Sequence, residues 1–143
     1  MKISGFTFLR NTSKLYYPVL ESIQSALPIV DEFVVALGKG DHDDDTEEKL
    51  LSLGSEKLKI IHTFWDTDKY PRGMEYAHQT DIAKEACSGD WLLYLQADEV
   101  IHEEDYAEIF LKCKRYLDDK SVDGFLFNYY HFYGDYGHYF RDH

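Results

Sequence analysis

The chain has 143 residues, of which 44% are hydrophobic, and a formal net charge of −12. This length allows one domain with a substantial core, and the hydrophobic content excludes disorder as a description of the whole chain. Because nucleic acids and anionic membrane surfaces require clustered Lys and Arg, the charge argues against both as partners. No run approaches the roughly 20 apolar residues of a membrane-spanning helix, so we expect a cytoplasmic protein that is not an integral membrane protein. Peripheral attachment at the inner membrane face would depend on segments outside this chain.

Apolar segments of strand length alternate with amphipathic segments along the whole chain. In order, they predict a strand at residues 3–9, a helix at 16–26, a strand at 32–37, a helix at 46–53, a strand at 59–63, a helix at 74–87, a strand from 92, a helix at 104–117 and a strand at 123–130. Strands that alternate with helices of this size form right-handed βαβ units, which give a mainly parallel sheet with helices on both faces. We therefore predict an α/β, Rossmann-like fold with a single domain over residues 1–143.

The most informative segment is the apolar run at residues 92–101, which two adjacent carboxylates, Asp98 and Glu99, interrupt. The run follows a turn signal at residues 88–90 and has no polar face, so it predicts a fully buried strand. Ligands of open α/β sheets bind beyond the carboxyl ends of the strands, where these acids would meet a divalent cation and a phosphate. A second interpretation is equally open at this point: the acids merely cap the helix that begins near Glu103.

The order of elements resembles the nucleotide-binding half of glycosyltransferase family 2, which has the GT-A fold. The resemblance covers essentially the whole chain. It is most specific over residues 77–99, where a helix leads through Ser88-Gly89-Asp90-Trp91 into Leu95-Gln96-Ala97-Asp98-Glu99. It implies metal-assisted, inverting transfer of a sugar from a nucleotide-diphosphate sugar, of the UDP or GDP type, to an acceptor hydroxyl. It also implies Mg²⁺ or Mn²⁺ as the cofactor, and it leaves open whether the acceptor is a glycan, a lipid or a protein.

The family's D-x-D motif assigns roles to the turn after the acid-tipped strand. Its last acid reaches the metal that bridges the donor diphosphate, and Asp98 matches that acid. Gln96 replaces the first acid, and its amide can hydrogen-bond a ribose hydroxyl without adding negative charge. Ala97 lies between them in the donor site, and Glu99 is the expected second carboxylate on the metal or its water shell. His78-Gln79 stands where the family commonly has Arg-Asn.

The ends of the first two strands supply the other donor-site candidates. In the family, the segment after the first strand passes beneath the nucleoside, so Arg10 is expected to approach the diphosphate, whose oxygens suit a planar guanidinium. A surface cation beside an acid is the equally open alternative. Gly38 and Lys39 follow the second strand, and Lys39 is a weaker phosphate-binding candidate at the ligand edge. Ala36-Leu37-Gly38 replaces the family's acidic turn, and the acids arrive later, at residues 41–45, where a solvated loop with an N-cap is the favoured interpretation.

The last segment, residues 129–140, is densely aromatic, which suits either stacking on a sugar ring or a half-exposed core. Because family members continue through acceptor-binding elements and a general base, we expect the chain to be truncated before them, and no catalytic base is assigned. We therefore expect weak binding of metal and nucleotide and little or no sugar transfer. The main alternative is a non-catalytic α/β nucleotide-binding or interaction module that has lost the donor chemistry. A nucleotidyltransferase is a more distant alternative.

Overall fold

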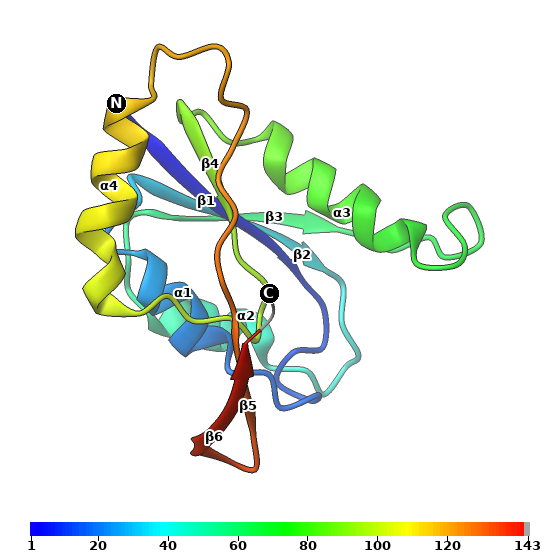
Figure 1. The fold of residues 1–143 in the computed structure, drawn as a ribbon. Coiled ribbons are helices and arrows are strands. Elements are labelled where there is room, and N and C mark those ends of the chain that lie inside the picture. The colour runs from blue at the N-terminus through cyan, green and yellow to red at the C-terminus, as the bar shows by residue number, and fades with distance from the viewer. Residues whose placement is uncertain (142–143) are drawn as a thin grey trace.

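The main sheet has four parallel strands in the order β3-β2-β1-β4 (Figure 1). The computed structural model describes residues 1–141. The strands are β1 (Ile3–Leu9), β2 (Glu32–Gly38), β3 (Leu58–Thr63), β4 (Trp91–Tyr94), β5 (Tyr130–Tyr133) and β6 (Asp135–Arg141). The helices are α1 (Val19–Ala26), α2 (Thr46–Ser52), α3 (Met74–Glu85) and α4 (Tyr106–Arg115), with a single 3-10 turn, η1, at Glu103–Asp105. The predicted α/β class and mainly parallel sheet are confirmed.

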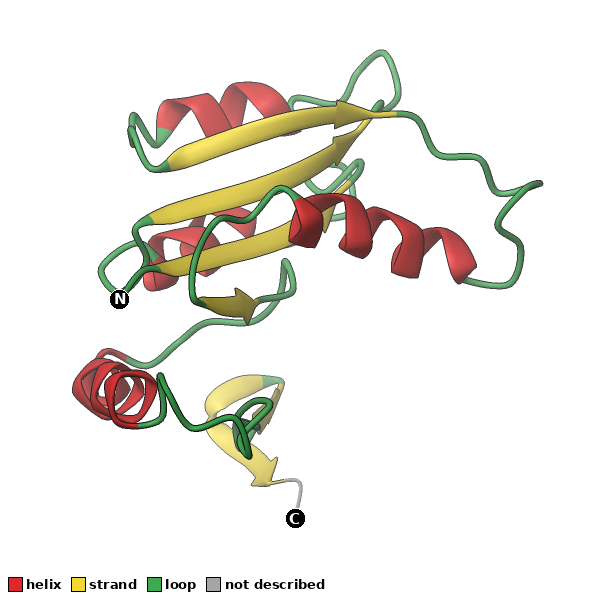
Figure 2. Cartoon of the chain, turned by 90° about the horizontal axis from the view of Figure 1, so that it is seen from above, coloured by secondary structure: helices red, strands yellow, loops and turns green. Residues whose placement is uncertain are grey.

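Helices cover both faces of the sheet, as predicted: α3 lies on one side, and α1 and α2 lie on the other (Figure 1, Figure 2). The side chains of a strand alternate between the two faces. In β2, Phe33 and Val35 belong to the larger core, which α1, α2 and α4 complete, whereas Val34 and Ala36 belong to the smaller core beneath α3. Burial from both sides explains why β2 has an uninterrupted apolar sequence.

The first helix is shorter than predicted. The helix expected from residue 16 begins at Val19, because Tyr16 has a left-handed backbone with φ of 61° and Pro18 occupies the N-cap position. Proline has no N–H to donate and restricts the residue before it, so the helix starts after it. Among residues 1–141, no helix combines the length and the apolar character that crossing a membrane requires.

The acid-tipped strand is shorter and less buried than predicted, because β4 is an edge strand. It pairs only with β1, and its Leu92 and Tyr94 are 39% and 38% exposed. Leu95 still reaches the larger core, and the chain then leaves the sheet. The prediction of a fully buried strand running up to the acids is therefore wrong, and Asp98 stands on a turn beyond the strand.

The strand predicted at residues 123–130 is also wrong. Its first seven residues form no strand, and the chain then makes an antiparallel hairpin of β5 and β6 around Gly134, whose φ is 77°. Aromatic cross-strand contacts support the hairpin, such as Tyr130 with Tyr139, whose ring centres lie 5.0 Å apart. A cavity of about 490 Å³ lies between β4, α4 and residues 123–128. None of the predicted donor-site residues lines it.

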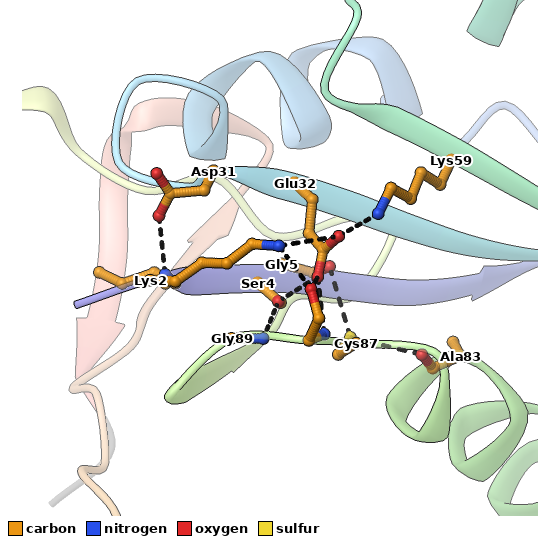
Figure 3. A network of polar contacts seen from close by, with 11 residues as sticks. Lys2, Ser4, Gly5, Asp31, Glu32, Lys59, Ala83, Cys87 and Gly89 are labelled. Carbon is orange, nitrogen blue, oxygen red and sulfur yellow. Dashed lines mark hydrogen bonds and ion pairs between the residues drawn. The ribbon is translucent and has the colours of Figure 1, made fainter.

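The buried carboxylate of Glu32 ties together the amino ends of the strands (Figure 3). Its Oε1 accepts hydrogen bonds from Ser4 Oγ (2.6 Å), Ser88 N–H (2.7 Å) and Ser88 Oγ (2.7 Å). Its Oε2 accepts a short hydrogen bond from Lys59 Nζ and lies 3.5 Å from Lys2 Nζ. Burial alone raises the pKa of Glu32, but the hydrogen bonds from its partners outweigh burial and hold the pKa well below its ordinary value. This network lies at the edge opposite the carboxyl ends of the strands, so we assign it a structural role.

Candidate functional site

The parallel strands bring their carboxyl ends to one edge of the sheet, which is where open α/β sheets bind ligands. Arg10 follows β1, Lys39 follows β2, and residues 96–99 follow β4. Because β1 lies between β2 and β4, Arg10 stands at the end of the strand that separates the other two positions. The structure therefore places every predicted donor-site residue at the same edge, in two local groups.

The first group consists of Arg10 and Gly38, which lie against Trp65, and Lys39, which bonds to Arg10 through its carbonyl oxygen. Arg10 Nε donates a hydrogen bond to the Lys39 carbonyl oxygen (3.0 Å), and its guanidinium carbon lies 5.3 Å from the centre of the Trp65 ring. A Cβ atom at Gly38 would lie 2.4 Å from Trp65 Nε1, so only glycine leaves room for this indole. The Lys39 ammonium lies 5.7 Å from the centre of the Phe64 ring. Arg10 forms no ion pair within residues 1–141, but the Asp41 carboxylate lies close enough to interact with it electrostatically, so both interpretations of Arg10 stay open.

A cavity of about 320 Å³ opens beside this group, between the ends of β2 and β3. Residues 37–41, Asp44, Glu47 and residues 62–64 line it. His62 Nε2 and Glu47 Oε1 lie 2.6 Å apart on its wall. Gly38 and Lys39 therefore border this cavity, whereas Arg10 and the turn after β4 are not part of its lining.

The acids after β2 belong to a loop that is fastened to the end of β1. Lys14 Nζ lies 3.0 Å from Asp41 Oδ2 and 3.0 Å from Asp43 Oδ1, and Asn11 Oδ1 accepts a hydrogen bond from the Asp41 N–H (2.8 Å). The hydrogen bond from Lys14 is the main reason why the pKa of Asp41 is lowered. Asp45 occupies the N-cap position of α2, although its side chain makes no capping bond. The exposed loop and the N-cap position are therefore confirmed, but the expected capping hydrogen bond does not form. Lys14 offsets part of the loop's negative charge.

The second group is the turn at residues 96–99, whose backbone is held at several points. Glu99 Oε2 accepts a hydrogen bond from the Gln96 N–H (2.8 Å), and the Glu99 N–H donates to the Gln96 carbonyl (3.1 Å). Ser22 Oγ of α1 donates to that same carbonyl (2.8 Å), and Ala97 packs against the larger core. Asp98 is exposed, and its carboxylate has no hydrogen bond or ion pair within residues 1–141. The turn thus presents one unpartnered carboxylate from a fixed backbone.

The two acids do not cap the helix that follows them. At η1 the capping side chain is His102, whose Nδ1 accepts a hydrogen bond from the Glu104 N–H (3.2 Å). Glu99 caps only its own turn, at the Gln96 N–H. The interpretation of Asp98 and Glu99 as helix caps is therefore wrong, and Asp98 is available to a ligand.

Asp98 and Glu99 suit a cation whose remaining ligands come from a phosphate better than a cation whose ligands all come from the protein. Residues 1–141 contain no cluster of three or more His, Cys, Asp or Glu side chains able to hold a metal ion. Mg²⁺ usually binds through one or two carboxylates together with substrate phosphates and waters, and this turn can supply the carboxylates. Burial raises the pKa of the nearby Tyr129, and a hydrogen bond to Glu99 raises it further. The Tyr129 hydroxyl therefore keeps its proton beside the acids.

Comparison with solved structures identifies a protein of similar fold. The structure resembles that of TarS residues 1–349 from S. aureus, with a TM-score of 0.59 and 18% sequence identity. TarS is a glycosyltransferase. The chain therefore has a glycosyltransferase-like fold. The match covers 81% of this chain and 33% of the TarS chain, so the chain spans about a third of its neighbour's length. No protein-family profile and no curated protein sequence matches the chain, and membership of glycosyltransferase family 2 stays a prediction.

The sequence did not identify Trp65 as part of the site. Its signal was weak: an aromatic residue soon after the third strand, in a polar and aromatic connection over residues 64–73. In the structure, the Trp65 indole lies against Gly38, beneath the Arg10 guanidinium. This contact joins the ends of three strands that are far apart in the sequence, so no local pattern reveals it.

A buried polar cluster that the sequence also did not reveal anchors the same connection. Glu75 Oε1 accepts a hydrogen bond from Gln79 Nε2 (2.7 Å), Glu75 Oε2 accepts one from the Asp66 N–H (2.9 Å), and Thr63 Oγ1 donates to Gln79 Oε1 (2.6 Å). Burial raises the pKa of Glu75, but hydrogen bonds from Gln79, His78 and the Asp66 N–H outweigh it and leave the pKa lowered. Glu75 therefore fastens the start of the connection to α3, and Gln79 ties α3 to the end of β3.

Proposed function

We propose that this chain is the donor-binding part of a glycosyltransferase that uses a nucleotide-diphosphate sugar together with Mg²⁺ or Mn²⁺. One observation carries the proposal. At the carboxyl edge of a glycosyltransferase-like fold, a guanidinium, Arg10, and an unpartnered carboxylate, Asp98, follow the neighbouring strands β1 and β4. A diphosphate bridged by a dication needs both a cationic group and a metal-binding carboxylate, so this pairing fits such a ligand.

In this proposal each candidate residue has a separate task. Arg10 and Lys39 bind diphosphate oxygens, which a chain of net charge −12 would otherwise repel. Asp98 holds the metal with help from Glu99, and Gln96 hydrogen-bonds a ribose hydroxyl. When bound, the metal stabilises the negative charge that develops on the departing nucleoside diphosphate. The fixed backbone at residues 96–99 supports this assignment, because a preorganised turn loses little freedom when it binds a ligand.

The acceptor side of the reaction is a wider part of the same proposal. An acceptor hydroxyl, on a glycan, a lipid or a protein, attacks the anomeric carbon with inversion while a general base removes its proton. No residue of this chain is assigned as that base. We expect these 143 residues to bind the donor weakly and to transfer little sugar.

Titration calorimetry with UDP and GDP tests the donor site. With Mn²⁺ present, we expect the wild-type chain to bind at least one of the two nucleotides, and we expect EDTA or Asp98→Ala to abolish that binding. Asp118→Ala is the matched control, because Asp118 is an exposed carboxylate just beyond α4 with no partner within residues 1–141. Binding that Asp98→Ala leaves unchanged would contradict the assigned metal site.

A non-catalytic nucleotide-binding or interaction module is the second candidate function. The hydrogen bond between Glu99 and the Gln96 N–H favours it, because this bond engages one of the two carboxylates while Gln96 itself is neutral. Such a module would keep the scaffold without donor chemistry. Failure of the wild-type chain to bind any nucleoside diphosphate, with or without Mn²⁺, would reject the first function and support an interaction module. Nucleotide binding that needs neither Mn²⁺ nor Asp98 would support a non-catalytic nucleotide-binding module.

A further inference from the structure

The Arg10 guanidinium is held from two directions. Its Nε atom donates to the Lys39 carbonyl oxygen (3.0 Å), which fixes the inner side of the fork. Its carbon lies 5.3 Å from the centre of the Trp65 ring, a distance at which the indole attracts a cation. Within residues 1–141, the two terminal amino groups of Arg10 form no hydrogen bond. The guanidinium is therefore oriented while its outer donors stay free.

The Trp65 indole is itself held by ring packing. Its ring centre lies 6.0 Å from that of Phe8, in a tilted arrangement, and 5.5 Å from that of Tyr76, in an edge-on arrangement. Its Nε1 atom is buried and has no hydrogen-bond partner within residues 1–141, so shape and not a polar contact fixes the ring. Gly38 completes the fit, because any Cβ at that position would displace the indole.

The acidic loop after β2 is the alternative destination for Arg10. The Asp41 carboxylate lies near enough to interact electrostatically with Arg10, although Lys14 already binds it at 3.0 Å. An Arg side chain without a supporting ring is free to turn toward such a carboxylate. Its charge would then be neutralised, and its planar fork would no longer face a phosphate.

We propose that Trp65 is the positioning residue of the donor site: it holds the Arg10 guanidinium ready for the diphosphate, and the missing side chain of Gly38 gives it the space to do so. This inference rests on the proposed donor site. Trp65 touches Arg10 and not the reacting atoms, so it acts through Arg10. The aromatic ring at position 65, and not the indole N–H, holds the Arg10 guanidinium.

A series of variants measures this effect on the affinity for UDP or GDP with Mn²⁺. We expect Arg10→Ala to weaken binding by about 10- to 100-fold, the range for loss of charged hydrogen bonds. Trp65→Ala should weaken it by roughly 3- to 30-fold, the range for a partly desolvated cation–π contact. Gly38→Ala should act in the same direction as Trp65→Ala. Trp65→Phe should retain most of the affinity, because a phenyl ring also supports a cation.

Trp91→Phe is the matched control and also provides a direct readout. Trp65 and Trp91 are the two tryptophans of the chain, and Trp91 lies at the start of β4, where its Nε1 donates to the Cys113 carbonyl. Trp91→Phe should bind nucleotide like the wild type, and its tryptophan fluorescence comes from Trp65 alone. Titration of this variant with inorganic diphosphate and Mn²⁺ should change the Trp65 emission, and adding Arg10→Ala should remove the change. This readout does not depend on whether Trp65→Ala folds.

The outcomes separate the inference from the proposed function. If wild type binds nucleotide and Arg10→Ala weakens binding while Trp65→Ala and Gly38→Ala do not, the positioning role is overturned and the donor site stands. Unchanged Trp65 emission at a saturating concentration of a ligand that needs Arg10 overturns it as well. If the wild-type chain binds no nucleoside diphosphate, the proposed function fails, and the inference fails with it.

Discussion

Replacing Glu32 by Gln removes the charge at the centre of the network that joins the amino ends of the sheet. Gln keeps the shape, but its amide nitrogen would face the ammonium groups of Lys59 and Lys2, which lie against Oε2 in the wild type. Hydrogen bonds to a charged group contribute about 1.5–3 kcal/mol each. Lys59 and Lys2 are 56% and 42% exposed, so they can turn to water and recover part of the loss. We therefore expect a loss of about 2–4 kcal/mol, which lowers Tm by roughly 6–15 °C.

The effect of Glu32→Gln should also depend on pH. Because folding lowers the pKa of Glu32, its charged form favours the native state. This contribution is complete above the ordinary pKa of 4.5 and is lost progressively as the pH falls below that value. Gln does not titrate. The difference in the free energy of unfolding between wild type and variant should therefore be largest at neutral pH and should decrease as the pH falls below 4.5.

Urea unfolding followed by circular dichroism, at about pH 7 and about pH 3.5, measures both effects. Glu56→Gln is the matched control, because Glu56 is exposed and has no partner within residues 1–141, and we expect it to change stability by less than about 0.5 kcal/mol. If Glu32→Gln were as stable as the wild type at neutral pH, the assigned role of the network would be refuted. A difference of constant size down to the lower pH would refute the link to the Glu32 charge.

Three further predictions test other parts of the structure. Burial raises the pKa of Cys87 to about 11, so alkylation measured by mass spectrometry should be slow at neutral pH and should accelerate as the pH approaches that value; fast alkylation at neutral pH would contradict this. Glu75→Gln should lower stability by about 1–3 kcal/mol and should speed hydrogen exchange at the Asp66 amide, whereas unchanged exchange would show that the cluster does not anchor the loop. Gly89→Ala would place a Cβ 2.7 Å from the Ser4 backbone nitrogen, so urea unfolding should show a loss of about 1–3 kcal/mol, and unchanged stability would contradict this.

The sequence predicts those elements of the fold whose signals are local. The central strand β2 is recognisable because burial on both faces demands a continuous apolar run, and α2 begins at Thr46 as its polar preceding loop indicates. Strand pairing is not local, and there the predictions go wrong. Residues 123–130 have strand composition, but composition does not say which edge a segment joins, and the pairing forms later, between β5 and β6.

The candidate site follows the same division. Parallel strands put their carboxyl ends at one edge, so the sequence places Arg10, Lys39 and Asp98 on the same side without further information. The contact between Arg10 and Trp65 requires the strand order β3-β2-β1, which hydrophobic periodicity does not contain. The engagement of Glu99 by the Gln96 N–H is a property of turn geometry and is equally hidden in the sequence.

An exposed carboxylate is ordinary on a chain with 27 acidic residues, so exposure alone does not set Asp98 apart. Its neighbours at the carboxyl edge are already engaged: Asp41 by Lys14, Glu47 by His62, and Glu99 by the turn itself. Asp98 stands on a fixed backbone and has no hydrogen bond or ion pair within residues 1–141, one strand away from an oriented guanidinium. Two opposite charges held apart at a binding edge attract each other poorly across water, but they bind strongly to a species that carries both signs. A metal-bound diphosphate is such a species, which is why loss of either Arg10 or Asp98 should weaken the same ligand.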